Sequence, residues 1–185
     1  MSKNPFRSKV ISVEEPFCNR VKELETLANG ALSGNNFVLI GPRRHGKTSL
    51  VKRVQKHLEG QGVITLFVDF NGVGSIDEVA SSFAKAVFQV TRKNKPLWKL
   101  AFESIQGFRP TAKLEYDAEG TVSVGVDFSQ TGKRGLELLD DTLDSVGQFI
   151  SKSGKQVNVV LDEFQEITTL PDSLKVEGLL RRHIQ

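Results

Sequence analysis

Apolar residues along this chain occur in two patterns, short continuous runs and longer stretches in which they recur every three or four positions. The continuous runs are typical of buried strands, and the periodic stretches of amphipathic helices. The predicted strands are residues 37–40, 63–68 and 157–162; the predicted helices are residues 20–32, 47–60, 75–90 and 136–150, with a last helix from Pro171. This alternation predicts an α/β fold with a mostly parallel sheet.

Two polar signals refine the helix boundaries. Asn19 is a suitable cap for the first helix, and Ser75 with Glu78 forms a capping box for the third.

Residues 93–134 interrupt this alternation. Pro96–Gln106 predicts a short helix with its large apolar residues on one side. Lys113–Tyr116 and Val122–Phe128 then alternate with period two around turn-forming residues 117–120, which predicts a β-hairpin. We interpret the stretch as an insertion that either decorates the core fold or contacts a partner.

The most specific motif is G-P-R-R-H-G-K-T at residues 41–48, directly after the apolar run Phe37–Ile40. A glycine-rich loop between a strand and a helix, ending in Gly-Lys-Thr, is the phosphate-binding (Walker A) pattern. Gly41 and Gly46 let the backbone approach an anion, Lys47 supplies a charge for the terminal phosphates, and Thr48 supplies a hydroxyl for Mg²⁺. The predicted nucleotide-contacting residues are Gly41, Pro42, Arg43, Arg44, His45, Gly46, Lys47, Thr48 and Ser49.

A second motif ends the predicted strand 157–162, where an apolar run is followed by Asp162 and Glu163. Such a run predicts a central strand with both faces buried, and ligands bind at the carboxyl ends of parallel strands. We therefore expect Asp162 to hold Mg²⁺ together with Thr48 (a Walker B site). Glu163 is expected to polarise the attacking water, and Lys47 and Glu163 are the two candidate catalytic residues. The alternative is an acid pair at a surface strand end. Asp69, after the second strand, either organises that water or caps a turn.

Composition bounds the other possibilities. Apolar residues make up 38% and charged residues 25% of 185 residues, which is ordinary for a soluble globular domain. No apolar run is long enough to cross a membrane, no signal peptide is visible, and the single Cys18 fits a reducing cytoplasm. The net charge of +3 is too small to indicate nucleic-acid binding by itself, which leaves that partner weakly supported.

The motifs together resemble the archaeal-type ATPases of the STAND branch of AAA+ P-loop proteins. The resemblance covers residues 14–185 and rests on a box at Pro16–Leu24, the loop Gly41–Leu50, and Leu161–Ile167 with Leu180-Arg181-Arg182 following. It implies a three-layer α/β/α fold, ATP rather than GTP as the nucleotide, and Phe17 and Arg20 near the adenine. Phe17 could instead be a hydrophobic staple on the first helix. Arg181 or Arg182 could act as an arginine finger in trans or be an exposed helix charge.

The expected function is an ATP-binding ATPase domain that acts as an ATP-driven or ATP-gated switch. The alternatives are a nucleotide-gated protein-interaction module without significant turnover and a DNA-associated AAA+ ATPase. A protein partner or self-assembly through regions outside this chain is expected. Three core strands are visible, where such a sheet normally has five or more, and neither a polar sensor residue on a fourth strand nor the family's C-terminal lid has a counterpart. We expect an N-terminal extension at 1–13 and an incomplete ATPase domain at 14–185, which leaves hydrolysis by this chain open.

Overall fold

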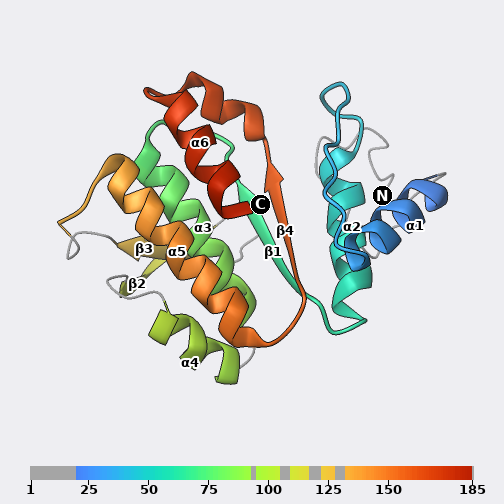
Figure 1. Ribbon diagram of the computed structural model, residues 1–185, viewed down its shortest axis with the longest axis horizontal. Coiled ribbons are helices and arrows are strands. Elements are labelled where there is room, and N and C mark those ends of the chain that lie inside the picture. The colour runs from blue at the N-terminus through green and yellow to red at the C-terminus, as the bar shows by residue number, and fades with distance from the viewer. Residues whose placement is uncertain (1–19, 93–94, 105–108, 117–121, 128–131, 185) are drawn as a thin grey trace, which may run out of the picture. The chain divides into compact units, whose positions relative to one another are not determined.

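A computed structural model describes residues 20–92, 95–104, 109–116, 122–127 and 132–184 (Figure 1). The chain divides into two compact units, residues 1–63 and residues 64–185. The phosphate-binding motif lies in the first unit and the Asp162-Glu163 motif in the second.

The first unit contains two helices, α1 (Val21–Leu32) and α2 (Lys47–Glu59). Both confirm the helices predicted from the apolar periodicity, because one face of each helix contributes to a shared core. That core consists of Ala28, Val54, Leu58 and Val63, with four partly buried residues of α1 packed against it. Arg20 occupies the N-cap position of α1 without a side-chain capping bond, and Asn19 lies outside the described residues.

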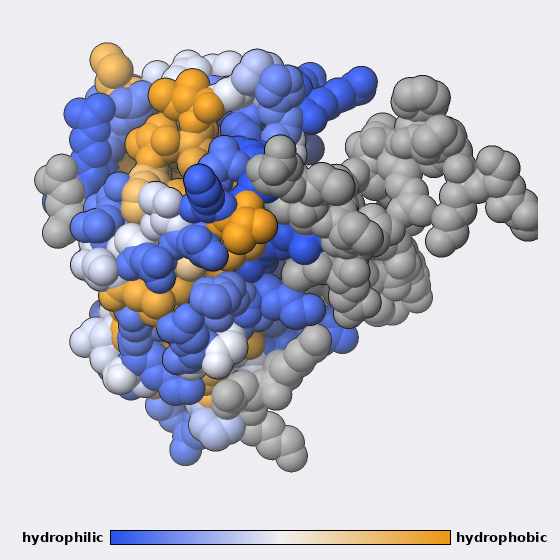
Figure 2. Space-filling model, turned by 90° about the vertical axis from the view of Figure 1, so that its right-hand side faces the viewer, coloured by the Kyte–Doolittle hydropathy of each residue, from blue (hydrophilic) through white to orange (hydrophobic). Residues whose placement is uncertain are grey.

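The strand predicted at Phe37–Ile40 is not formed, and this prediction is wrong for the structure: these residues have no regular secondary structure. Val38 and Ile40 are 85% and 93% exposed, whereas Phe37 and Leu39 are 45% and 37% exposed. The Phe37 ring lies against Gly30 of α1, where an added Cβ would overlap it. The segment therefore has an inward and an outward side, but no neighbouring strand pairs with it among the described residues. Figure 2 shows one face of the molecule, on which hydrophobic residues are exposed among hydrophilic ones.

The second unit is built on two parallel strands, β1 (Ile64–Asp69) and β4 (Val157–Asp162). They pair in register from Ile64 beside Val157 to Asp69 beside Asp162. Both strands and their parallel direction confirm the sequence prediction. Figure 1 shows the helices α3 (Ile76–Thr91), α5 (Gly135–Ser153) and α6 (Ser173–Ile184) on the same side of this sheet. A short 3₁₀ helix, η1 (Phe164–Thr169), connects β4 to the turn before α6.

The predicted capping box at the start of α3 is confirmed. The Glu78 backbone N–H donates to Ser75 Oγ at 3.3 Å, and Glu78 Oε2 accepts a hydrogen bond from the Gly74 N–H at 2.7 Å. Because both bonds satisfy backbone donors at the helix start, they fix where the chain leaves β1 and enters α3.

The core of the second unit lies between β1 and the helices. Phe70, Phe88 and Phe149 are fully buried in it, and the Phe70 and Phe83 rings lie 5.8 Å apart. The expectation that β4 is buried on both faces is wrong for the structure, because its residues are half-buried and Val159 is exposed. The reason is that the helices α3, α5 and α6 cover this two-stranded sheet from one side (Figure 1).

The insertion has the predicted composition of one helix and a hairpin. Helix α4 (Lys95–Ser104) is followed by β2 (Arg109–Tyr116) and β3 (Val122–Asp127), which pair antiparallel. The predicted turn residues 117–120 lie outside the described residues. Trp98 of α4 packs its ring 5.5 Å from that of Phe88, so the insertion is anchored to the core through α3.

Candidate functional site

The loop between Phe37–Ile40 and α2 has a backbone that requires glycine. Gly46, the N-cap of α2, adopts a left-handed conformation with φ 70° and ψ 23°, and helix α2 begins at the next residue, Lys47. Arg44 also has a positive φ of 65°. Residues 41–45 are exposed. The loop therefore leads an accessible backbone directly to a helix N-terminus, where backbone N–H groups and the helix dipole favour an anion.

The Lys47 side chain folds back across this loop. Its Nζ donates to the carbonyl oxygens of Gly41 at 2.9 Å and Pro42 at 3.1 Å. An ammonium group held by two carbonyl oxygens has a third proton for another acceptor. The donor set of the loop, a lysine ammonium beside a helix N-terminus, fits a polyphosphate.

Arg20 connects the upstream box to the loop. Its guanidinium binds both carboxylate oxygens of Glu23, with Nε 2.6 Å from Oε2, and its NH1 donates to the His45 carbonyl at 3.1 Å. The hydrogen bond that Arg20 donates to Glu23 raises the pKa of Arg20 and lowers the pKa of Glu23. Arg20 therefore stays charged and lies beside the loop, while Phe17 is outside the described residues.

The remaining residues of the motif lie on the first turn of α2. Thr48 is half-buried and Ser49 is buried, with 4% of its surface exposed. Thr48 lies at the open end of the helix, as a metal-binding hydroxyl in this motif must, whereas Ser49 packs into the unit.

In the second unit, Asp162 and Glu163 lie at the carboxyl end of β4. The Asp162 carboxylate accepts a hydrogen bond from the Glu163 backbone N–H, with Oδ1 at 3.1 Å. Glu163 has a left-handed backbone with φ 52° and is the N-cap of η1. Its Oε2 accepts a hydrogen bond from Gln165 Nε2. The chain thus turns sharply after the strand, and the turn fixes both carboxylates.

Asp69, at the end of β1, lies next to Asp162 in the strand register. Its Oδ1 accepts a hydrogen bond from the Asn71 N–H at 2.9 Å. An aspartate that caps a turn forms a hydrogen bond of this kind.

The structure brings the predicted residues together in two groups. Arg20, His45 and Lys47 lie around the loop of the first unit, and Asp162 and Glu163 lie at the end of β4 in the second. No group of three or more His, Cys, Asp or Glu side chains that could hold a metal ion occurs within the described ranges.

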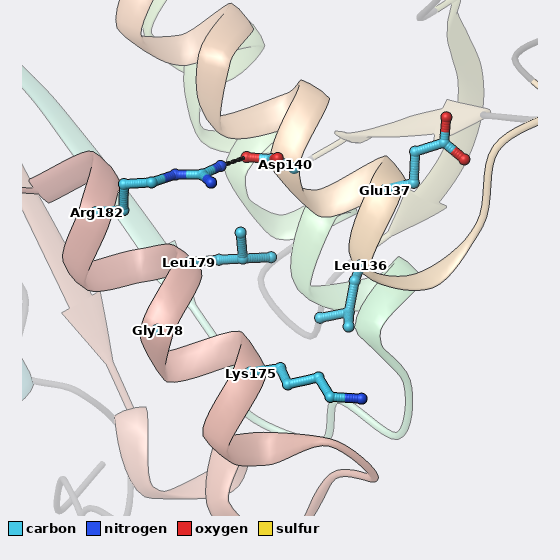
Figure 3. Close-up of a pocket in the computed structure, with 7 residues that line it drawn as sticks. All are labelled: Leu136, Glu137, Asp140, Lys175, Gly178, Leu179 and Arg182. Carbon is cyan, nitrogen blue, oxygen red and sulfur yellow. Dashed lines mark hydrogen bonds and ion pairs between the residues drawn. The ribbon is translucent and has the colours of Figure 1, made fainter.

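The two candidate arginine fingers of α6 both form ion pairs. Arg181 binds Glu177 one turn earlier at 3.3 Å, and Arg182 binds Asp140 of α5. Figure 3 shows Arg182 and Asp140 at the rim of an open groove between α5 and α6, with Leu136 and Leu179 pointing into it. Ion pairs of this kind are typical of exposed charged residues on helices.

Sequence reasoning missed two partners of the predicted residues. Glu23 could have been found, because it lies three residues after Arg20 on a helix, where opposite charges meet. Gln165 was visible only as part of the motif after Glu163, and its contact depends on the left-handed turn, which no periodicity indicates.

Comparison with known proteins identifies the class of protein to which this chain belongs. The family described as an ATPase domain predominantly from Archaea matches residues 17–182. The chain therefore belongs to this family of archaeal-type ATPases. It follows that the chain is a nucleotide-binding domain of the ATPase class, with an α/β architecture. Searches of curated proteins and of solved structures give no significant match. None of the helices in the described part of the chain has the length and apolarity to span a membrane.

Proposed function

We propose that this chain binds ATP with Mg²⁺ through the loop Gly41–Thr48 and hydrolyses it slowly, as a regulatory switch of the STAND/AAA+ type. The observation that supports this most directly is the Lys47 ammonium folded over a loop whose last glycine, Gly46, has a left-handed backbone at the start of α2. Because residues 41–45 of the loop are exposed, a polyphosphate could contact them without breaking the hydrogen bonds of α2.

The catalytic roles follow from the chemistry of the side chains. Lys47 would neutralise charge on the terminal phosphates, and Thr48 and Asp162 would hold Mg²⁺, which further offsets the charge that develops during transfer. Glu163 would orient the attacking water and accept its proton. The hydrogen bond from the Glu163 N–H to Asp162 supports this division, because it orients Asp162 while the Glu163 side chain remains at the strand end.

The remaining loop and box residues would form the wall of the nucleotide site. The bond from Arg20 to the His45 carbonyl supports a place for the upstream box, including Phe17, beside the adenine. Pro42, Arg43 and Arg44 are exposed next to it and would contact the phosphates or a partner. These assignments follow the family resemblance.

We also propose that the complete domain has the three-layer α/β/α P-loop fold with a mostly parallel sheet. Ligands bind at the carboxyl ends of parallel strands, and β4 ends at Asp162.

The switch would act in the cytoplasm on a protein partner or on further copies of the chain. Nucleotide-dependent ordering of a segment is a common way in which such a switch works.

Titration calorimetry with Mg·ATP tests the binding site. We expect a dissociation constant on the order of 1 μM, no measurable binding for Lys47→Ala, and weaker competition by GTP than by ADP. Lys56→Ala is the matched control, because it removes one lysine charge from the last turn of the same helix. Equal loss in both variants would show that net charge, rather than the loop, binds the nucleotide.

The same proteins test turnover. Glu163→Gln is expected to bind ATP normally and to lose at least about 100-fold in kcat, because it removes the base for the attacking water. ATP binding without turnover in the unsubstituted chain would instead indicate a nucleotide-gated interaction module.

A further inference from the structure

The turn after β4 holds Glu163 in an unfavourable backbone conformation. A left-handed φ of 52° is unfavourable for a residue with a side chain, so the surrounding contacts must maintain it. The Glu163 N–H is bonded to Asp162 at 3.1 Å, and the Glu163 carbonyl accepts a bond from the Glu166 N–H at 2.9 Å. The backbone of Glu163 is therefore fixed on both sides.

Phe164 anchors the same turn to the core. Its ring packs edge-on, 6.4 Å from the ring of Phe70, which is fully buried. Because the residue that follows Glu163 is held in this way, the direction in which the Glu163 side chain leaves the backbone is also set.

The Glu163 side chain can still rotate about its own bonds, and Gln165 restricts this rotation. Gln165 is exposed on η1, and its Nε2 donates to Glu163 Oε2. An exposed side chain has no packing role in the core, so this bond is the contact through which Gln165 acts. A neutral amide binds one carboxylate oxygen and leaves the negative charge in place, whereas an arginine or lysine there would neutralise it.

We propose that Gln165 is a positioning residue for Glu163. By holding Oε2, the amide directs Oε1 toward the position of the attacking water and reduces the rotamer freedom that Glu163 must lose in the transition state. This inference rests on the proposed role of Glu163 in ATP hydrolysis.

Steady-state ATP turnover of four proteins tests it: the unsubstituted chain, Gln165→Met, Glu163→Gln and the double variant. Methionine keeps the length of the side chain and removes the donor. We expect kcat to fall roughly tenfold in Gln165→Met with KM for ATP unchanged, since only positioning is lost. In the Glu163→Gln background the same substitution is expected to have no further effect, because Gln165 acts through Glu163.

Two further variants sharpen the comparison. Gln165→Lys restores a donor of similar reach but neutralises the Glu163 charge, so it should not recover the lost kcat. Glu166→Gln changes a neighbouring residue of η1 and should leave kcat as it is. Unchanged or increased kcat in Gln165→Met, or an equal decrease in both backgrounds, would overturn the inference.

A measurement without turnover tests the contact itself. The side-chain amide signals of Gln165, identified in a ¹⁵N spectrum by their loss in Gln165→Met, should move in Glu163→Ala and stay in place in Glu166→Ala. No movement in Glu163→Ala overturns the inference even where hydrolysis is intact. If Glu163→Gln hydrolyses ATP at the original rate while the amide signals move as expected, the proposed function fails and the contact remains, so the two failures are distinguishable.

Discussion

Three non-glycine residues in the described part of the chain have a left-handed backbone, Arg44, Glu163 and Asp172. Arg44 lies in the phosphate-binding motif and Glu163 directly after Asp162. At about 1–2 kcal/mol each, these conformations are retained only where neighbouring contacts hold them. Strain at the residue scale is thus concentrated in the two motifs that the sequence singled out for chemistry.

Gly46 provides a prediction at this scale. Gly46→Ala is expected to destabilise the chain by about 1–2 kcal/mol, because alanine disfavours φ near 70°. It should also abolish ATP binding, since the new Cβ and the altered loop face the anion. Calorimetry gives the affinity and chemical denaturation the stability.

Gly34→Ala is the matched control. Gly34 has a φ of 78° and, like Gly46, has no atom within 4 Å of an added Cβ. The control should lose similar stability and keep ATP affinity. Loss of affinity in both variants would mean that the loop has no special place in binding.

At the scale of elements, α6 is held to α5 by a charge cluster as well as by apolar contacts. Asp140 of α5 accepts bonds from Arg182 and from His183 Nε2, the latter at 2.8 Å. The bond from Arg182 and, secondly, that from His183 lower the pKa of Asp140. His183 Nδ1 also lies 3.7 Å from Asp144, so carboxylates of α5 face both ring nitrogens.

Asp140→Asn is expected to lower the melting temperature at neutral pH by an amount on the order of 2 °C, since water screens this exposed pair. A carboxyl whose pKa is lower in the folded state stabilises it above the unfolded pKa, and this contribution is lost as pH falls through the folded pKa. The difference between Asp140→Asn and the unsubstituted chain should therefore decrease as the pH falls below about 4, the ordinary pKa of aspartate, and vanish once the folded-state carboxyl is protonated.

Glu177→Gln is the control for this prediction, because it breaks the pair with Arg181 inside α6 and leaves the contact with α5 intact. It should change the melting temperature less than Asp140→Asn does. A difference for Asp140→Asn that persists in acid would show that the carboxylate charge is not its source.

At the scale of the whole molecule, the two units have very unequal cores. In the described part of the first unit, the buried apolar residues are Ala28, Leu50, Val54, Leu58 and Val63, whereas the core of the second includes β1, α3 and α5. A unit with so small a core gains little from its own burial.

The sequence by itself determined the local elements, because apolar periodicity and capping residues act over a few positions. The helices α1, α2, α3 and α5, the strands β1 and β4, and the hairpin β2–β3 all lie where these patterns place them. It also indicated the ATPase class through the loop Gly41–Thr48, since that spacing is set by phosphate geometry.

Tertiary structure decided what depends on neighbours far apart in the chain. Phe37–Ile40 has the composition of a strand but forms none, because a strand requires a partner and composition does not supply one. The left-handed turn at Glu163 and its bond from Gln165 follow from the anchoring of Phe164 on Phe70, a contact between residues 94 positions apart, which a local pattern does not reveal.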